Sequence, residues 1–395
     1  MANQNKYPVV LLHGMFGFGE QQVTNNFLPY FGLWNTNIKK MFEAEGIRTV
    51  APSMGPFTSA WNRACEIYAQ LFGGTVDYGK AHSEKYGCER YGRTYEALLP
   101  EWGTKDKDGN LIKINIIGHS FGGVSGRMLN YLMTYGSAEE RAATDAEDLS
   151  PLFAGGHGGW VHSITTLASP HNGMTSVEGK VGKAMETICL FLVDIVSMLD
   201  ATSLRRFYDL QLDQYGINAK PDQKVNPWKF LDSKKVGMYF FKDDNIVYDL
   251  TLEGAEKLNA LIPVEPNVYY FSFRGGRTRN IPNTYYHIPE LKAFPLLNIL
   301  GFFMGIQQSG CPDEKTWHEN DMVINTVSAE APTGAPRTDY GKPAVGFDYK
   351  PGVFNVFKKE HKDHMSYCGW MENHKEYANF YQTIYDMVSS LPTID

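Results

Sequence analysis

The chain has 395 residues, of which 43% are hydrophobic and 13% aromatic, and this content excludes a disordered chain, which lacks the apolar residues for a core. Its 37 basic and 44 acidic side chains give a formal net charge of −7, which argues against nucleic acid as a partner, because nucleic acid requires a clustered basic face. The five Cys are too few for a disulfide framework, and their odd number leaves at least one unpaired.

Short apolar runs alternate with helical patterns along the chain. Val9–Leu12 and Ile114–Ile117 are continuous apolar runs, as in buried strands. Val161–Leu167 and Val268–Phe273 are further strand candidates, since they are rich in β-branched and aromatic residues. The apolar positions between Phe380 and Leu391 form one helical face. This alternation predicts an α/β fold with a mostly parallel central sheet and helices on both of its faces.

The chain shows no internal repeat, low-complexity tract or linker, so we expect one domain over residues 1–395. Residues 55–95 and 175–240 do not fit the alternation, and we expect both to be insertions in that domain. No stretch reaches the roughly 18 uninterrupted apolar residues of a membrane span, and Met1–Lys6 lacks the apolar core of a signal peptide.

The segment Gly118–Gly122, with the sequence GHSFG, fits the G-x-S-x-G pattern of a nucleophile elbow. The motif follows a predicted strand and precedes a helical pattern, and a third glycine, Gly123, suits close helix–strand packing. In such an elbow the reactive side chain is that of Ser120, on a tight strand-to-helix turn that the flanking glycines permit. The alternative is a glycine-rich turn with an unreactive serine.

A serine nucleophile requires hydrogen-bond donors directed at the oxygen that becomes negatively charged. The backbone N–H of Phe121, directly after the nucleophile, is one candidate. The loop after the first strand supplies the other, and the position of His13-Gly14 there makes the N–H of Met15 the second candidate. We interpret His13 itself as an ordinary buried turn histidine.

In this type of fold the acid and then the base follow the nucleophile along the chain. His364 lies just before the final helix and is favoured as the base, whereas His361 lies in a stretch rich in Lys and Glu and is typical of a solvated surface residue. Asp321 precedes an apolar run, where a strand-end loop is expected, and is favoured as the acid. Asp313 and Asp339 lie in Pro- and Gly-rich loops and are the weaker alternatives.

Nine further motifs occur in order over nearly the whole chain: Leu11–Gly14, Tyr68–Leu71, Gly73–Gly79, Gly92–Tyr95, Leu149–Phe153, Ser169–Gly173, Leu212–Gly216, Gly254–Asn259 and Glu319–Asp321. With them the chain resembles the zinc-containing secreted lipases of thermophilic bacilli and their staphylococcal relatives. The resemblance implies an α/β-hydrolase fold. It places the nucleophile on Ser120, the acid on Asp321, the base on His364 and the oxyanion donors on the backbone of Met15 and Phe121.

The resemblance implies a secreted triacylglycerol lipase with carboxylesterase activity, which acts by acyl transfer on lipid esters at a lipid–water interface. It implies no protein partner. A phospholipase or a lipid acyltransferase with the same triad is the alternative enzyme, because one sequence does not reveal the pocket shape that selects the headgroup. A catalytically silent lipid-binding protein of the same fold is the alternative from another class.

The family also implies a structural zinc ion, held partly by the 55–95 segment. The positions aligned with its ligands are Asn62, His82, Cys88 and Asp244. Cys88 replaces a histidine and could bind zinc as a thiolate, whereas Asn62 replaces an aspartate and is a poor ligand. The alternative is a surface histidine with a free cysteine. At the positions of the family's calcium carboxylates the chain has Ser366 and Met371, so no calcium is expected.

The stretch Met185–Leu199 is predicted to be a helix that is apolar over most of its circumference. It follows Ser169–His171, where the family places a mobile lid, so we expect it to cover the acyl pocket and to open at a lipid surface. The alternative is a buried core helix. The predicted lid residues are Ile188, Leu190, Phe191, Leu192, Val193 and Ile195.

Overall fold

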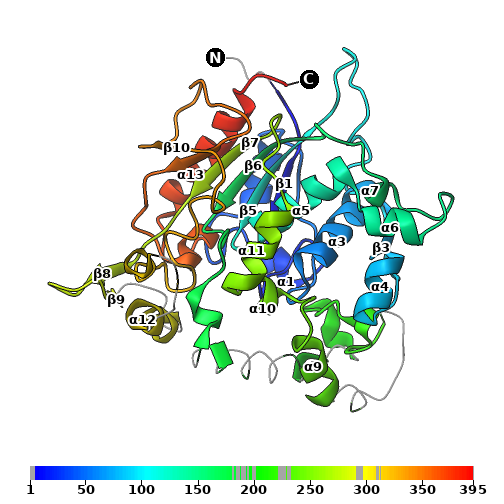
Figure 1. Cartoon of the computed structure of the whole chain (residues 1–395). Coiled ribbons are helices and arrows are strands. Elements are labelled where there is room, and N and C mark those ends of the chain that lie inside the picture. Colours follow the sequence, from blue (N-terminus) through cyan, green and yellow to red (C-terminus); the bar gives the residue numbers. More distant parts are fainter. Residues whose placement is uncertain are drawn as a thin grey trace.

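The computed structural model describes residues 5–179, 202–220, 233–290, 297–307 and 313–394, together with residues 182, 183, 187, 193, 195–197, 228 and 311. Figure 1 shows the whole chain, with one central sheet and helices around it. Among the described helices, none is both long and apolar enough to cross a membrane.

The central sheet has seven strands, and every neighbouring pair is parallel. In spatial order they are β10 (Arg337–Tyr340), β11 (Phe354–Phe357), β7 (Tyr269–Phe273), β6 (Val161–Leu167), β5 (Ile114–His119), β1 (Val9–Leu12) and β2 (Thr49–Val50). The four strands expected from the apolar runs are therefore present. Leu12 at the end of β1 pairs with Gly118 of β5, so the loops after these two strands meet at one edge of the sheet.

Alternate residues of the buried strands face two separate apolar clusters. Val10 and Leu12 of β1 pack with α3 (Ala60–Phe72) and α5 (Phe121–Tyr135) on one face. Val9 and Leu11 pack with α2 (Ile38–Ala44) and α13 (His374–Ser389) on the other face. Strands buried on both faces are the reason that these runs are continuously apolar. The predicted mostly parallel sheet with helices on both faces is confirmed.

The segment predicted as the first insertion, residues 55–95, has two parts. Its first part contains α3, whose residues are nearly all buried and which packs against α5, so this helix belongs to the main core. The second part lies outside the seven-stranded sheet and consists of β3 (Gly74–Asp77), α4 (Lys80–Tyr86) and β4 (Tyr91–Tyr95). There β3 and β4 pair as an antiparallel two-stranded sheet.

The remaining described elements are short and connect or cover these layers. The helices are α1 (Thr24–Phe27), α6 (Ala138–Ala143), α7 (Pro151–Ala154), α9 (Ser233–Phe240), α10 (Ile246–Asp249), α11 (Leu252–Leu261) and α12 (Asn298–Ile306). The single-turn 3-10 helices are η1 (Thr175–Val177), η2 (Ser203–Arg206), η3 (Asp213–Tyr215), η6 (Glu314–Thr316) and η7 (His364–Cys368). The strands β8 (Thr278–Asn280) and β9 (His287–Pro289) form a separate antiparallel pair.

The predicted lid falls mostly outside the described residues, and this applies to Ile188 and to Leu190–Leu192. Val193 is described and is fully buried in the cluster that contains α3 and α5. Ile195 is half-buried. The described part of this stretch therefore packs, at least through Val193, on the main core.

Gly122, at the start of α5, is packed so closely that a larger residue there should destabilise the protein. A Cβ on Gly122 would collide with the backbone carbonyl oxygen of Leu12, which cannot move without displacing β1. We expect Gly122→Ala to lower the free energy of unfolding by about 1–3 kcal/mol, the usual cost of overpacking. Urea unfolding followed by circular dichroism measures this change.

Gly237→Ala is the matched control, because nothing lies within 4 Å of a Cβ at that position in α9. It is expected to leave stability unchanged or to raise it by up to about 1 kcal/mol through helix propensity. A Gly122→Ala protein as stable as the wild type would contradict the packing argument.

Candidate active site

Ser120 forms a sharp turn between β5 and α5. Its backbone has φ +56° and ψ −132°, a conformation that side-chain-bearing residues adopt rarely and that is typical of strained functional positions. The backbone N–H of Ser120 donates a hydrogen bond of 2.8 Å to the carbonyl of Leu167 at the end of β6. The turn therefore holds this serine at the carboxyl edge of the sheet, between the ends of its central strands.

His364 and Asp321, the predicted base and acid, are in direct contact. The Nδ1 atom of His364 lies 2.9 Å from the Oδ2 atom of Asp321, and the backbone N–H of His364 donates to the carbonyl of Asp321 over 2.8 Å. The other carboxylate oxygen accepts backbone N–H bonds from Val323 and Ile324, at 3.0 and 2.7 Å. Because the carboxylate is fixed against Nδ1, this nitrogen carries the proton and Nε2 is left as an acceptor.

The structure places the predicted base next to the elbow. The ring of His119, the residue before Ser120, lies 4.6 Å from the ring of His364 between centroids. The alternative His361 has a side chain that is 66% exposed and pairs with Glu290 on the surface. The alternative acid Asp339 is also exposed and pairs with Arg337. Contact and burial thus favour His364 and Asp321 over the alternatives.

The loop after β1 touches the elbow at Gly14. A Cβ on this glycine would lie 2.6 Å from the Cβ of Ser120, so only glycine permits the close approach. Among the hydrogen bonds between described residues, none uses the backbone N–H of Met15 or of Phe121. Phe121 is the first residue of α5, where an N–H has no partner within the helix. Neither N–H group therefore has a hydrogen-bond partner among the described residues, as the predicted role of an oxyanion donor requires.

His13 has the structural role that was expected. Its Nε2 accepts the backbone N–H of Met54 over 3.0 Å, so its Nδ1 carries the proton and donates to the carbonyl of Gly14 over 2.9 Å. Burial, with the charge of Arg63 as a second cause, holds the pKa of His13 well below its ordinary value. The ring is thus neutral and orients the peptide between Gly14 and Met15.

Two further polar side chains, those of Tyr30 and His119, lie next to the elbow, and the sequence pattern predicted no role for them. The hydroxyl of Tyr30 lies 2.8 Å from Nδ1 of His119 and accepts the backbone N–H of Gly14 over 3.0 Å. The Nε2 atom of His119 lies 3.0 Å from the carbonyl oxygen of His364. Only the place of His119 within the elbow motif hinted at such a role, since Tyr30 lies in an irregular loop.

The four predicted zinc ligands come from three segments of the chain. Two of them, His82 and Asn62, contact the carboxylate of a third, Asp244. Asp244 is buried, and its Oδ2 lies 3.1 Å from Nε2 of His82 and 3.2 Å from Nδ2 of Asn62. Ser59 and Tyr215 also donate to this carboxylate. Burial alone would raise the pKa of Asp244, but the charge of His82 and these hydrogen bonds hold it below its ordinary value.

The donor set matches a zinc site only in part. Cys88 is half-buried, and burial raises the pKa of its thiol to about 11, with the charge of Asp244 as a second cause. In the part of the chain that the structure describes, no group of three or more His, Cys, Asp or Glu is arranged to hold a metal. The buried Oδ1 of Asn62, however, has no hydrogen-bond partner, and a half-turn of its amide would direct this oxygen at Asp244, where the amide nitrogen now lies.

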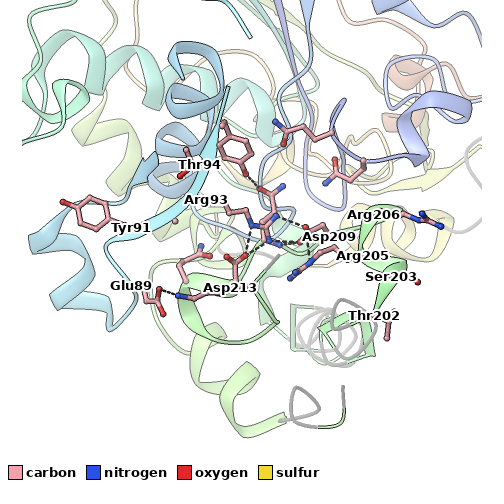
Figure 2. Close-up of a pocket in the computed structure, with 17 residues that line it drawn as sticks. Glu89, Tyr91, Arg93, Thr94, Thr202, Ser203, Arg205, Arg206, Asp209 and Asp213 are labelled. Carbon is pink, nitrogen blue, oxygen red and sulfur yellow. Dashed lines mark hydrogen bonds and ion pairs between the residues drawn. The ribbon is translucent and has the colours of Figure 1, made fainter. Parts of the chain in front are cut away.

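A polar cavity of about 930 Å³ lies beside β4 and the 202–220 segment. Figure 2 shows Arg93 between Asp209 and Asp213, and its Nη1 lies 2.7 Å from Oδ2 of Asp209. Glu89 and Lys220 pair at 2.5 Å in the same cavity. These pairs tie the 74–95 segment to residues 209–220. None of the predicted triad residues lines the cavity, so it is separate from the elbow.

Comparison with known proteins identifies the family. Residues 5–393 match the family described as Lipase-like, C-terminal domain. Lipase 2 of Staphylococcus aureus is 32% identical over 403 residues, which cover 97% of this chain and 54% of that protein. The chain thus spans about half the length of the curated relatives it matches.

Two solved structures are similar over almost their full length. Staphylococcus hyicus lipase has a TM-score of 0.83 and 30% identity, covering 98% of this chain and 97% of that one. Lipase 1 from Pelosinus fermentans has a TM-score of 0.79 and 32% identity, covering 98% and 100%. These neighbours confirm the predicted α/β-hydrolase fold and the resemblance to staphylococcal lipases. The chain belongs to the family described as Lipase-like, C-terminal domain.

Proposed function

We propose that the protein is a triacylglycerol lipase that hydrolyses the carboxylic ester bonds of acylglycerols, with Ser120 as its nucleophile. The observation that carries this proposal is the buried Asp321–His364 hydrogen bond beside a serine in a strained strand-to-helix turn. The relatives named lipase, at 30 and 32% identity over nearly the whole chain, support the substrate class.

The proposed reaction is acyl transfer through a covalent intermediate. The Oγ atom of Ser120 attacks the ester carbonyl carbon while Nε2 of His364 takes the hydroxyl proton. The backbone N–H groups of Met15 and Phe121 bind the resulting oxyanion. His364 then passes the proton to the departing alcohol. Water attacks the acyl-enzyme with the same histidine as base, which releases the fatty acid and restores the hydroxyl of Ser120.

Replacement of the nucleophile tests the proposal directly. We expect Ser120→Ala to lower kcat for a p-nitrophenyl ester by at least about 10³-fold, because no other group in this mechanism can form the acyl-enzyme. The variant should also lose labelling by a fluorophosphonate and keep the circular dichroism spectrum of the wild type. Ser203→Ala, at an exposed serine of η2, is the matched control. Turnover at the wild-type rate in Ser120→Ala would refute the proposal.

A lid over Met185–Leu199 is part of the proposal, as is a location outside the cell, which follows from the resemblance to secreted lipases. The exposed face of α12 supports contact with a lipid surface. Ile299 on this helix is 70% exposed, and Phe302 and Phe303 are 41% and 43% exposed. An apolar surface of this kind is typical of a site that contacts another apolar phase.

Opening of a lid at a lipid surface predicts a rate that depends on the physical state of the substrate. Hydrolysis of a short-chain triacylglycerol should rise abruptly once its concentration exceeds its solubility. The measurement is initial rate against concentration across that limit, with a fully soluble p-nitrophenyl ester as the control. Ordinary saturation of the rate with no rise at the solubility limit would refute the proposal that a lid opens at the lipid surface. Faster turnover of phospholipid vesicles, or transfer of the acyl group to an added alcohol in preference to water, would favour the alternative enzymes.

We further propose a structural zinc ion held by His82 and Asp244, with Cys88 and Asn62 completing its coordination. The convergence of His82, Asn62 and Asp244, and the partnerless oxygen of Asn62, support this site. The ion would join α3, α4 and the segment after α9, and the mechanism above does not use it.

Metal analysis of the purified protein, prepared without chelators, tests the zinc proposal. We expect close to one equivalent in the wild type and loss of the metal in Asp244→Asn, because the carboxylate is the shared centre of the cluster. Asp243→Asn, at the neighbouring exposed carboxylate, is the control and should retain the metal. Less than about half an equivalent in the wild type would overturn the proposal.

A further inference from the structure

The loop that carries Gly14 and the proposed base His364 both lie next to the elbow, and one continuous hydrogen-bonded chain joins them. The chain runs from the backbone N–H of Gly14 to the hydroxyl of Tyr30, from there to His119, and from His119 to the carbonyl of His364. All three distances lie between 2.8 and 3.0 Å. The mechanism above uses neither side chain.

The direction of each hydrogen bond follows from its partners. The carbonyl oxygen of His364 can only accept, so Nε2 of His119 carries the proton and donates to it. The Nδ1 atom of a neutral ring is then an acceptor, and the hydroxyl of Tyr30 donates a hydrogen bond to it. The same hydroxyl oxygen accepts the N–H of Gly14. A neutral His119 suits this pattern, because burial, together with the charge of His364, keeps the pKa of His119 well below its ordinary value.

Both ends of this chain reach groups that the reaction requires in fixed positions. Gly14 precedes Met15, whose N–H is a proposed oxyanion donor. His364 is the proposed base, and its backbone carbonyl is the group that His119 binds. His119 is 1% exposed, so no bulk water replaces these contacts when they are lost. Small displacements of reacting groups cost catalysis far more than they cost folding.

We propose that Tyr30 and His119 are positioning residues that set the oxyanion donor of Met15 and the base His364 in register with each other across Ser120. This inference rests on the proposed function. It adds to that function a specific physical link between two loops that the triad itself does not connect. The hydroxyl of Tyr30 and both ring nitrogens of His119 act in it as one unit.

The Cys368 thiol also approaches this chain, since its Sγ lies 3.4 Å from Nδ1 of His119. It is a second donor near the same nitrogen. The thiol also hydrogen-bonds with the side chain of Tyr30, but no described hydrogen bond joins it to the backbone of Gly14 or Met15, so the proposal gives it no positioning role. Cys368→Ala is expected to change kcat by less than about twofold.

Three substitutions divide the chain at different points. Tyr30→Phe keeps the ring and removes the hydroxyl. His119→Gln retains a donor where Nε2 was and removes the acceptor for Tyr30, whereas His119→Asn retains an acceptor near Nδ1 and removes the contact with His364. We expect each to lower kcat for p-nitrophenyl butyrate by about 10-fold, with KM within about twofold of the wild type. The double variant Tyr30→Phe with His119→Gln should lose no more than either single variant, because the two residues form one unit.

Tyr270→Phe is the matched control, since this buried hydroxyl also accepts a backbone N–H, that of Glu265, at 3.1 Å and away from the elbow. Like Tyr30→Phe, it should lower the melting temperature, but it should leave kcat unchanged. Wild-type kcat in Tyr30→Phe, or additive losses in the double variant, would overturn the positioning role. The absence of esterase activity in the wild type, by contrast, would refute the proposed function, so the two failures are distinct.

Discussion

The candidate active site lies at the carboxyl edge of the central sheet, and its arrangement depends on how closely the turn at Ser120 packs against the end of β1. The positive φ of this serine is unfavourable by itself, and the surrounding backbone must maintain it. Leu12 pairs with Gly118 in the sheet, and the carbonyl of Leu12 also lies against Gly122 at the start of α5. The same contact brings Gly14 against Ser120. One backbone approach thus places the nucleophile and the oxyanion loop together.

Two buried neutral histidines, His13 and His119, lie beside the turn at the carboxyl edge of the sheet. His13 and His119 are held in single tautomers by backbone carbonyl and N–H groups, and burial keeps both uncharged. Their rings therefore orient peptides without adding positive charge beside the nucleophile. The carboxylate of Asp321 is surrounded by two backbone N–H groups and His364, so all of its hydrogen bonds favour one orientation. Preorganised dipoles of this kind need no rearrangement when charge develops.

Away from this edge, charged side chains connect the segments that lie outside the central sheet. Arg93 on β4 binds Asp209 and Asp213, and Asp244 accepts bonds from Ser59 and Tyr215 in addition to the predicted zinc ligands. These buried charges are paired, which offsets the cost of removing them from water. The segment over residues 74–95 is therefore attached by these polar contacts as well as by the apolar side chains of Val76 and Tyr78, which lie in the same core cluster as α3.

The sequence by itself determined the features that depend on neighbouring residues. Continuous apolar runs identified β1, β5, β6 and β7, because strands buried on both faces require them, and the glycine spacing around Ser120 identified the elbow. The order and position of acid and base along the chain favoured Asp321 and His364, and the family resemblance assigned the two roles to these residues. The same reasoning placed the whole of residues 55–95 in one insertion, although α3 is a core helix, since its burial depends on α5 and not on its own pattern.

Only the tertiary structure decided the contacts between distant segments. Tyr30 and His119 are 89 positions apart, and His82 and Asp244 are 162 apart, so no local pattern could indicate that they touch. The structure also showed that Ser59 and Tyr215 share the carboxylate of Asp244, which the ligand spacing did not reveal. Local patterns determine strands, helices and turns because their physics acts over a few residues. Partners and tautomers are decided where the folded sheet brings its loops to one edge.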